Sequence, residues 1–367
     1  MTDALVAPPT LEAFGYTPEL ATAFTPHAAL GREPARAVAE DRGSYDVVAA
    51  SGERRAAISG RFRHEAAGDP SAYPAVGDWL VIERTSAGDT TIHALLPRRT
   101  ALIRQAPGKR TEAQVVGANL DTVFVVASLN ADLNLRRLER YVAAAWESGA
   151  EPVVLLSKAD LGGDAEAARL TVAGVAAGAS VVVVSSFDGR GVDEVRARIG
   201  AGRTVAFVGS SGVGKSTLLN RLAGEERAAV REIREDDARG RHTTTRRQLH
   251  LLPGGGLILD TPGMRELALW DADGLDQSFT DIDAIAERCR FTNCRHNGEP
   301  GCAIAASVAD GSLAEDRLAG WQKLVREAHH HERRVDALAR AEERRKWKAI
   351  GKSVAKHMNA KYGQGGW

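Results

Sequence analysis

A glycine-rich segment between a predicted strand and a predicted helix constrains the fold of this chain more than any other feature. Residues 204–208 are apolar and have strand length, and residues 218–222 continue as a helix. Between them lies the pattern G-x-x-x-x-G-K-S/T, which comprises Gly209, Ser210, Ser211, Gly212, Val213, Gly214, Lys215, Ser216 and Thr217. Backbone N–H groups of such a loop close around phosphate oxygens. The sequence therefore predicts a nucleotide-phosphate site.

Residues of the phosphate loop and of a second strand suit a nucleotide that is bound together with Mg²⁺. In the predicted loop, Lys215 neutralises the β- and γ-phosphates and the hydroxyl of Ser216 ligates Mg²⁺. Residues 256–260 form a short apolar strand that ends in Asp260, the first residue of a D-x-x-G string that ends at Gly263. An aspartate at such a strand end reaches the Mg²⁺ shell, and the glycine N–H can donate to the γ-phosphate. The string lies about 45 residues after Lys215, which strengthens the prediction.

The segment between these motifs contains the string Gly-Arg-His-Thr-Thr-Thr at residues 240–245. We predict that one of its threonines, with Thr244 as the candidate, closes over Mg²⁺ and the γ-phosphate. Many GTPases place a glutamine after D-x-x-G to orient the attacking water, and here that residue is Met264. We therefore expect slow intrinsic turnover and assign water orientation to His242. A structural or RNA-facing role for His242 is the alternative.

A predicted base site precedes the phosphate loop in the chain. The apolar run of residues 152–156 leads into Ser157, Lys158, Ala159 and Asp160. A carboxylate at this position accepts hydrogen bonds from N1–H and the 2-amino group of guanine, and adenine offers neither donor. Asp160 therefore predicts guanine selectivity, with Lys158 lying along the base.

This base motif departs from the usual Asn-Lys-x-Asp at its first residue. We expect Ser157 to lack the donor and the reach of the asparagine amide, which leaves the nucleotide affinity open while guanine selectivity survives. The next apolar run, residues 181–184, leads into Ser185 and Ser186. We predict that the backbone N–H groups of these two serines meet guanine O6.

Apolar runs of strand length alternate with helical patterns after residue 118, at residues 122–127, 152–156, 181–184, 205–208 and 257–259. This alternation predicts a doubly wound α/β sheet. An ordinary GTPase has its phosphate loop before its base motifs, whereas here Lys158 and Ser185 precede Lys215. The order predicts a circularly permuted GTPase domain, which the fold tolerates because the strand ends still meet at one edge.

The N-terminal third has a different pattern. Residues 1–34 show little periodicity and are interpreted as an irregular or partly helical lead-in. Short β-type stretches follow at residues 45–49, 56–60, 76–82 and 90–96. Their spacing favours a five-stranded oligonucleotide-binding (OB-like) barrel, and another kind of small β-domain fits the pattern equally well.

The three cysteines of the chain lie within one short segment of a predominantly helical C-terminal part. Cys289, Cys294 and Cys302 enclose His296 in the spacing C-x4-C-x-H-x5-C. Three thiolates and one imidazole form a closed tetrahedral zinc site, which contributes about 10–16 kcal/mol to folding in small domains. The sequence predicts one structural zinc ion there. Buried free cysteines are the alternative.

Charge is balanced over the whole chain, with 48 Lys and Arg against 48 Asp and Glu, so any attraction to nucleic acid must be local. Residues 323–361 contain 12 Lys and Arg against 5 Asp and Glu. This tail is a candidate phosphate-binding surface or, alternatively, a solvated amphipathic helix. The chain shows no signal peptide and no apolar run of membrane-spanning length, so we expect a cytoplasmic protein without a membrane partner.

The permuted motif order, the Gly-Arg-His-Thr-Thr-Thr string and the cysteine cluster together resemble the ribosome small-subunit-dependent GTPase A family of bacteria. Residues 76–78 and 118–121 also look like that family, and the resemblance covers roughly residues 36–330. The resemblance implies an N-terminal oligonucleotide-binding barrel, a permuted GTPase domain and a C-terminal zinc domain. It also implies a role in late maturation of the 30S ribosomal subunit, with GTP hydrolysis stimulated by that subunit.

These observations lead to one interpretation and two alternatives. We expect a multidomain protein in which residues 1–110 hold the lead-in and barrel, residues 111–272 the GTPase and residues 273–367 the zinc domain and basic tail. It is expected to act as a monomer that binds GTP and GDP with Mg²⁺ and contacts 16S rRNA on the 30S subunit. The alternatives are a P-loop ATPase and a nucleotide-switched RNA-binding module with negligible turnover.

Overall fold

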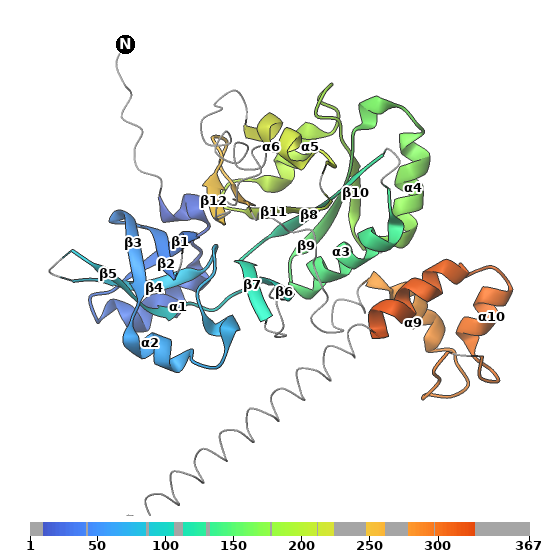
Figure 1. The fold of residues 1–367 in the computed structure, drawn as a ribbon, viewed down its shortest axis with the longest axis horizontal. Coiled ribbons are helices and arrows are strands. Elements are labelled where there is room, and N and C mark those ends of the chain that lie inside the picture. The colour runs from blue at the N-terminus through green and yellow to red at the C-terminus, as the bar shows by residue number, and fades with distance from the viewer. Residues whose placement is uncertain are drawn as a thin grey trace, which may run out of the picture.

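The computed structural model describes residues 10–41, 43–85, 88–105, 113–129, 133–176, 178–210, 212–223, 247–260, 278–296 and 298–326. Three regions follow one another along the chain: a small β-barrel, a larger α/β sheet and a helical C-terminal part (Figure 1). Among the described residues, no helix is both long and apolar enough to span a membrane.

The N-terminal region is a closed five-stranded barrel, as expected from the strand spacing. Its strands are β1 (Glu33–Asp41), β2 (Ser44–Ala49), β3 (Gly52–Ile58), β4 (Trp79–Arg84) and β5 (Thr90–Leu95). They pair in the order β1-β2-β3-β5-β4, and β4 pairs again with β1 to close the barrel. The connections contain the short helices α2 (Gly60–Glu65) and η2 (Pro70–Ala72).

The strand β1 was not predicted: residues 33–34 were assigned to the irregular lead-in, and no strand was expected over residues 35–41. That lead-in contains two helices, η1 (Leu11–Phe14) and α1 (Pro18–Ala28). Thr17 caps the second of them, since its side chain accepts a hydrogen bond from the N–H of Leu20.

A hairpin joins the barrel to the α/β sheet. It consists of β6 (Ala101–Gln105) and β7 (Ala113–Ala118), which pair with each other as a separate two-stranded sheet. The domain boundary predicted after residue 110 falls between these two strands.

The five apolar runs predicted as strands all lie in one parallel arrangement. They form β8 (Thr122–Ser128), β9 (Glu151–Ser157), β10 (Ser180–Val183), β11 (Thr204–Val208) and β13 (Leu257–Asp260), in the spatial order β10-β9-β8-β11-β13. One further strand, β12 (Gln248–Leu251), was not predicted. It runs antiparallel to β13 and meets β1 through the pair Ala39 and Gln248, so the barrel and the α/β sheet are continuous.

Helices cover both faces of this sheet, which confirms the doubly wound prediction. One core holds α3 (Leu135–Glu147) and α4 (Ala165–Val175), and the other holds α5 (Val192–Ile199) and α6 (Lys215–Ala223) (Figure 1). Alternate residues of β8 face opposite cores: Val123 and Val125 pack with α3, whereas Phe124 packs with α5 and α6. Helix α3 begins directly after Asn134, which is its N-cap: the side chain of Asn134 accepts a hydrogen bond from the N–H of Arg137.

Residues 76–78 and residues 118–121, which form part of the family resemblance noted in the sequence, meet where the barrel adjoins the α/β sheet. The side-chain Nδ2 of Asn119 donates to the carbonyl oxygen of Gly77 at 3.0 Å. Gly77 has φ +94°, and a Cβ at this position would overlap the carbonyl oxygen of Ala118. Only glycine allows this close backbone approach.

The C-terminal region packs beneath α3 (Figure 1). It comprises α9 (Thr280–Ala286), α10 (Ala303–Ala309) and a helix over residues 315–326. Arg317 of this last helix is buried and donates to Glu139 of α3 at 3.1 Å, to the carbonyl oxygen of Val175 at 3.0 Å and to Asp281 at 2.8 Å. This arginine fastens the C-terminal region to two helices of the α/β region.

Candidate nucleotide and metal sites

The predicted nucleotide residues converge on one edge of the α/β sheet. The phosphate loop follows β11, Asp160 follows β9, Ser185 follows β10, and Asp260 is the last residue of β13. These strands are parallel, so all four carboxyl ends lie at the same edge. Strand β8 lies between β9 and β11, so the residues that follow β9 and the phosphate loop that follows β11 are two strand spacings apart. At about 4.8 Å per spacing, this distance is about 10 Å. A nucleotide can bridge such a distance.

The phosphate loop has the backbone that its glycines allow. Gly209, Gly212 and Gly214 have φ values of +145°, +80° and +95°. A Cβ on Gly209 would overlap the carbonyl oxygen of Val126, so the loop can leave β11 in this direction only with glycine there. The described loop residues match the predicted cradle.

Lys215 is the first residue of α6, and its ammonium group lies over the loop. Its Nζ donates to the carbonyl oxygens of Gly209 at 2.7 Å and Ser210 at 2.6 Å. The side chains of Ser216 and Thr217, the next two residues, are exposed. The loop thus presents a cation and hydroxyl groups at the sheet edge, which are the groups that a magnesium-bound polyphosphate requires.

Asp160 lies in a short turn of 3-10 helix, η3 (Ala159–Leu161), and is held by Ser185. The Ser185 hydroxyl donates to Oδ1 of Asp160 at 2.8 Å, and it accepts the backbone N–H groups of Phe187 and Asp188 at 3.2 Å. This hydrogen bond fixes the orientation of the Asp160 carboxylate, and the side chain remains exposed, so a nucleotide base can reach it. Lys158, just before η3, has the unusual φ of +60°, which turns the chain sharply at the end of β9.

The structure changes the predicted role of Ser185. Its backbone N–H donates to the carbonyl oxygen of Arg190 at 3.0 Å, so this N–H is engaged within its own loop. Ser185 therefore orients Asp160 through its hydroxyl. The N–H of Ser186 remains the candidate donor to guanine O6.

Ser157 reaches the phosphate loop, contrary to our expectation that it would lack donor and reach. Its hydroxyl oxygen lies 2.5 Å from the carbonyl oxygen of Val213 and 3.2 Å from that of Ala127. A hydroxyl has one proton, so the shorter contact to Val213 is the hydrogen bond. The base segment and the phosphate loop are thus joined directly.

Several predicted residues lie outside the described residues. These are Ser211 of the phosphate loop, Gly263 and Met264 after β13, and the whole string of residues 240–245, including His242 and Thr244. The basic tail beyond residue 326 also lies outside them. Their predicted roles stay predictions.

The predicted metal ligands come together between α9 and α10. The Sγ atoms of Cys289, Cys294 and Cys302 and a ring nitrogen of His296 all lie within 4.8 Å of one another. Nδ1 of His296 is 3.6 Å from Sγ of Cys289 and 3.7 Å from Sγ of Cys302. Zinc bonds of about 2.3 Å to sulfur and 2.0–2.1 Å to nitrogen in a tetrahedron separate such atoms by about 3.6 Å. The cluster is therefore compatible with zinc.

Backbone N–H groups further suit these sulfur atoms to metal binding. The N–H of Ala303 donates to Cys289 Sγ at 3.3 Å, and that of Ala305 donates to Cys302 Sγ at 3.4 Å. At Cys294 the N–H of His296 works to lower the pKa, but burial and the neighbouring thiols of Cys302 and Cys289 raise it to about 11. At Cys289 burial works to raise the pKa, but the N–H groups of Ala303 and Ile304 and the side chains of Cys294 and Cys302 together lower it. A lowered thiol pKa favours the thiolate, which is the form that binds zinc.

The buried ionic cluster around Glu139 and Arg317 was missed in the sequence. Glu139 is 2% exposed and lies on the apolar side of α3, next to the buried residues Leu138 and Val142. A glutamate within an apolar stripe is the signal that could have indicated a buried partner. Its partner, Arg317, is distant in sequence and carries no pattern that links the two.

Comparison with known proteins shows a single family. The family model described as RsgA GTPase matches residues 95–270. The small ribosomal subunit biogenesis GTPase RsgA 2 of Lactiplantibacillus plantarum is 44% identical over 327 residues, which cover 89% of this chain and 92% of that protein. The small ribosomal subunit biogenesis GTPase RsgA of Streptomyces coelicolor is 44% identical over 360 residues, with 96% of both chains covered.

Two solved structures share the fold. The crystal structure of YjeQ from Thermotoga maritima has a TM-score of 0.60 at 24% identity and covers 81% of this chain and 98% of its own. The crystal structure of YloQ, described as a circularly permuted GTPase, has a TM-score of 0.58 at 22% identity and covers 82% and 96%. The permuted arrangement expected from the motif order is thus confirmed.

Proposed function

This chain belongs to the RsgA GTPase family and is a GTP-hydrolysing enzyme, and we propose that it acts in late maturation of the small ribosomal subunit. The names of the relatives, which are small ribosomal subunit biogenesis GTPases, identify the small ribosomal subunit as the proposed partner. The observation that carries the nucleotide part is the hydrogen bond from Ser157 to Val213, because it holds the base segment and the phosphate loop in one site.

The proposed binding roles follow from the positions of the side chains at the sheet edge. Asp160, oriented by Ser185, accepts N1–H and the 2-amino group of guanine, and Lys158 lies along the base. Residues 209–217 surround the phosphates, with Lys215 neutralising their charge.

The magnesium ligands that we propose come from the phosphate loop and from the end of the neighbouring strand β13. Ser216 provides its hydroxyl, and Asp260 approaches the ion from the end of β13. Bound Mg²⁺ supplies charge neutralisation on the β- and γ-phosphate oxygens. One threonine of residues 243–245 closes over Mg²⁺ and the γ-phosphate, and the N–H of Gly263 donates to the γ-phosphate.

We propose that hydrolysis depends on the subunit because Met264 has no group that hydrogen-bonds water. His242 orients the attacking water once the subunit fixes the string of residues 240–245. Contact between rRNA and the protein, through the barrel and the basic tail, then accelerates hydrolysis and sets the moment of release.

The cysteine cluster holds one structural zinc ion in this proposal. Four protein ligands leave no open coordination position, so the cluster stabilises the C-terminal region and has no part in the chemistry. We further propose that the protein is a cytoplasmic monomer, with functional units at residues 1–110, 111–272 and 273–367.

Nucleotide-dependent binding to ribosomal subunits tests this function. We expect the protein to cosediment with purified 30S subunits at least about 10-fold more strongly with a non-hydrolysable GTP analogue than with GDP. Lys215→Ala is the matched control and is expected to lose the nucleotide dependence. Equal binding to large subunits, or no binding to small subunits, contradicts the proposal.

A further inference from the structure

Strand β12 lies between the barrel and the proposed magnesium site and pairs with both. Ala39 of β1 is paired with Gln248 of β12, and Gln248 is in turn paired with Asp260, the last residue of β13. Each of these two ladders spans one strand spacing of about 4.8 Å. The barrel therefore lies about 10 Å from the backbone of the aspartate that we propose as a magnesium ligand.

Asp260 depends on β12 for its place in the sheet. On the other side of β13, the ladder with β11 ends at the pair of Ala206 and Leu259 among the described residues. The ladder with β12 continues for one residue more and includes Asp260. The backbone of Asp260 is thus held by Gln248, which is itself held by the barrel.

Strand β1 changes partner along its length. Residues 33–36 pair with β4 and close the barrel, and a bulge interrupts the pairing with β2 between Ala37 and Ala39. At the far side of this bulge, Ala39 pairs with β12. Bulges are common next to functional sites, where they redirect a strand. The bulge here marks the point at which β1 passes from closing the barrel to extending the α/β sheet.

An ion pair continues the contact between β1 and β12 by one residue. The antiparallel register places Glu40 opposite Arg247, and Nη1 of Arg247 lies 3.6 Å from Oε2 of Glu40. The same nitrogen donates to the carbonyl oxygen of Val115 in β7 at 3.5 Å. The side chain of Arg247 is only 15% exposed, so salt screens this pair less than a fully exposed pair. The pair therefore helps to fix β12 against the barrel.

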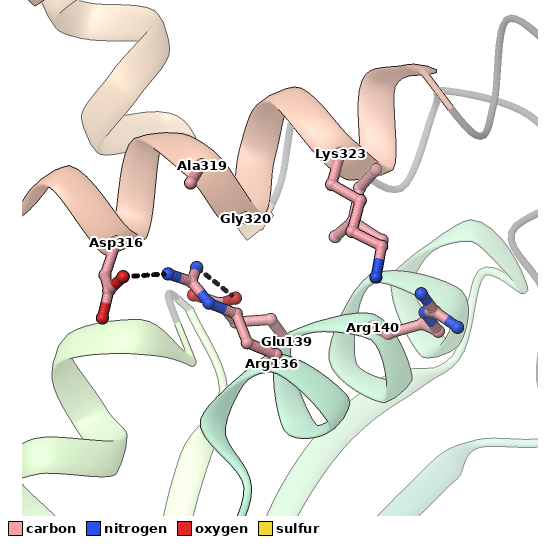
Figure 2. A pocket seen from close by; sticks show the side chains of 8 residues that line it. Arg136, Glu139, Arg140, Asp316, Ala319, Gly320 and Lys323 are labelled. Atoms are coloured by element: carbon pink, nitrogen blue, oxygen red, sulfur yellow. Dashed lines mark hydrogen bonds and ion pairs between the residues drawn. The ribbon is translucent and has the colours of Figure 1, made fainter.

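The C-terminal region is attached to the α/β region in a different way. Its helix of residues 315–326 lies against α3 around a cavity of about 240 Å³ (Figure 2). Side chains make this contact: Arg136 lies 3.5 Å from Oδ1 of Asp316, and Glu139 accepts a hydrogen bond from Arg317. This attachment is made by helices on one face of the sheet, whereas the barrel is paired with the sheet itself.

We propose that Gln248 and Arg247 are positioning residues that couple the barrel to Asp260, so that RNA binding at the barrel and Mg²⁺–GTP binding at the sheet edge strengthen each other. The inference rests on the proposed function and identifies the strand through which the subunit acts on the nucleotide site. A displacement of β1 moves β12 through the paired backbones and the ion pair, and β12 moves Asp260. Such a coupling is reciprocal, because each partner changes the affinity for the other by the same factor.

The test is a ratio of two affinities for 30S subunits, one measured with a non-hydrolysable GTP analogue and the other with GDP. We expect a ratio of at least about 10 in the wild type. Glu40→Gln and Arg247→Ala each remove one side of the ion pair. Both are expected to lower the ratio about 2–5-fold, the effect of one cross-strand pair of opposite charges, while the affinity with GDP stays unchanged.

Two further variants show whether the ion pair itself is responsible. Arg247→Lys keeps a positive charge opposite Glu40 and should retain the wild-type ratio. The double variant Glu40→Gln/Arg247→Ala should lower the ratio no further than either single change, because both remove the same pair. Glu40 is 31% exposed on the barrel, so Glu40→Gln tests the pair even if Arg247→Ala fails to fold.

Asp316→Asn is the matched control. It removes the partner of Arg136 in the attachment of the C-terminal region, where the ion-pair distance of 3.5 Å is close to the 3.6 Å of the tested pair. This variant should keep the wild-type ratio. A loss equal to that of Glu40→Gln would show that any loosened attachment reduces the coupling, and the specific role of β12 would then be wrong.

The remaining outcomes separate this inference from the proposed function. If the wild type has the expected ratio and the Glu40 and Arg247 variants keep it, the inference is overturned and the proposed function stays intact. A loss of affinity by the same factor with both nucleotides also overturns it, because the pair then contributes to subunit binding without coupling. If the wild type binds small subunits equally with either nucleotide, or not at all, the proposed function fails together with the inference.

Discussion

The hydroxyl of Ser157 donates to the carbonyl oxygen of Val213 at 2.5 Å, across 56 residues of sequence. Ser157 ends β9, which precedes the residues proposed to recognise guanine, and Val213 lies within the phosphate loop. A serine in the place of the usual asparagine therefore links the two halves of the nucleotide site. We expect the affinity for nucleotide to depend on this link, because a hydrogen bond to Val213 orders the phosphate loop before binding.

Removal of the hydroxyl tests that link. We expect Ser157→Ala to weaken GDP binding about 5-fold, because one buried hydrogen bond is worth about 1 kcal/mol. Ser157→Asn provides an amide donor at the same strand end and should bind GDP at least as tightly as the wild type. The dissociation constant, measured with a fluorescent nucleotide, decides the matter. Equal affinity in wild type and Ser157→Ala would show that the bond has no part in binding.

Asp160→Asn is expected to change base selectivity. The carboxylate accepts two hydrogen bonds from guanine, whereas the amide of asparagine offers one acceptor and one donor. Xanthine has a carbonyl group where guanine has its 2-amino group, so it fits the amide. We expect about a 10–100-fold loss of GTP affinity and a gain in affinity for XTP, from charged hydrogen bonds worth about 1.5–3 kcal/mol. Competition binding with GTP, XTP and ATP measures both effects, and unchanged GTP preference contradicts the assignment.

Gly77→Ala is expected to destabilise the junction between the barrel and the α/β sheet. Gly77 and Gly68 have similar φ values, +94° and +102°. A Cβ at Gly77 overlaps the backbone of Ala118, whereas a Cβ at Gly68 meets no atom within 4 Å. The Gly68→Ala variant therefore measures only the free-energy cost of placing a side chain at positive φ, which is about 1–3 kcal/mol. Urea unfolding should show Gly77→Ala to be less stable than Gly68→Ala by at least about 1 kcal/mol. Equal stabilities would exclude a tight junction.

The stability of the C-terminal region should depend on pH through Asp281. Burial works to raise the pKa of Asp281, but two hydrogen bonds from Arg317, at 2.8 and 2.9 Å, and the charge of Arg317 outweigh burial and lower the pKa. A carboxyl group with a lowered pKa stabilises the fold above its unfolded-state pKa of about 3.9. That contribution is lost as the pH falls through the folded-state pKa.

Asp281→Asn should therefore be less stable than the wild type at pH 7, and the difference should shrink as the pH falls below about 4. Asp316→Asn is the control, because the side chain of Asp316 is 99% exposed. The measurement is the free energy of unfolding across this pH range. A difference that stays constant with pH would show that Asp281 has the same pKa in both states.

The parts of the fold that the sequence predicted are those with local signals. The strands β8, β9 and β11 are unbroken apolar runs, which is the pattern of parallel strands buried on both faces. Strand β1 lacks that pattern because its core-facing residues Ala35 and Ala37 are alanines and the residue between them is the buried Arg36. Arg36 is buried where the barrel meets the α/β sheet, because it donates to the carbonyl oxygen of Phe14 and to the hydroxyl of Thr204, partners that only the folded chain provides.

The same distinction holds for the sites. Each predicted motif is a short contiguous string, and the described residues of these strings meet at the sheet edge or in the cysteine cluster. Two contacts at the nucleotide site depend on the folded chain. The hydroxyl of Ser157 donates to the carbonyl oxygen of Val213, and the N–H of Ser185 donates to the carbonyl oxygen of Arg190. No spacing in the sequence encodes such contacts, so the structure was needed to find them.

Single-turnover GTP hydrolysis, with and without purified 30S subunits, tests the central claim most directly. We expect slow turnover by the protein alone and an increase of several orders of magnitude with small subunits, since an activating partner adds about 10³–10⁵ in rate. ATP in place of GTP should give no stimulated turnover. Slow hydrolysis that small subunits leave unchanged, or stimulation equal for ATP and GTP, would contradict the account.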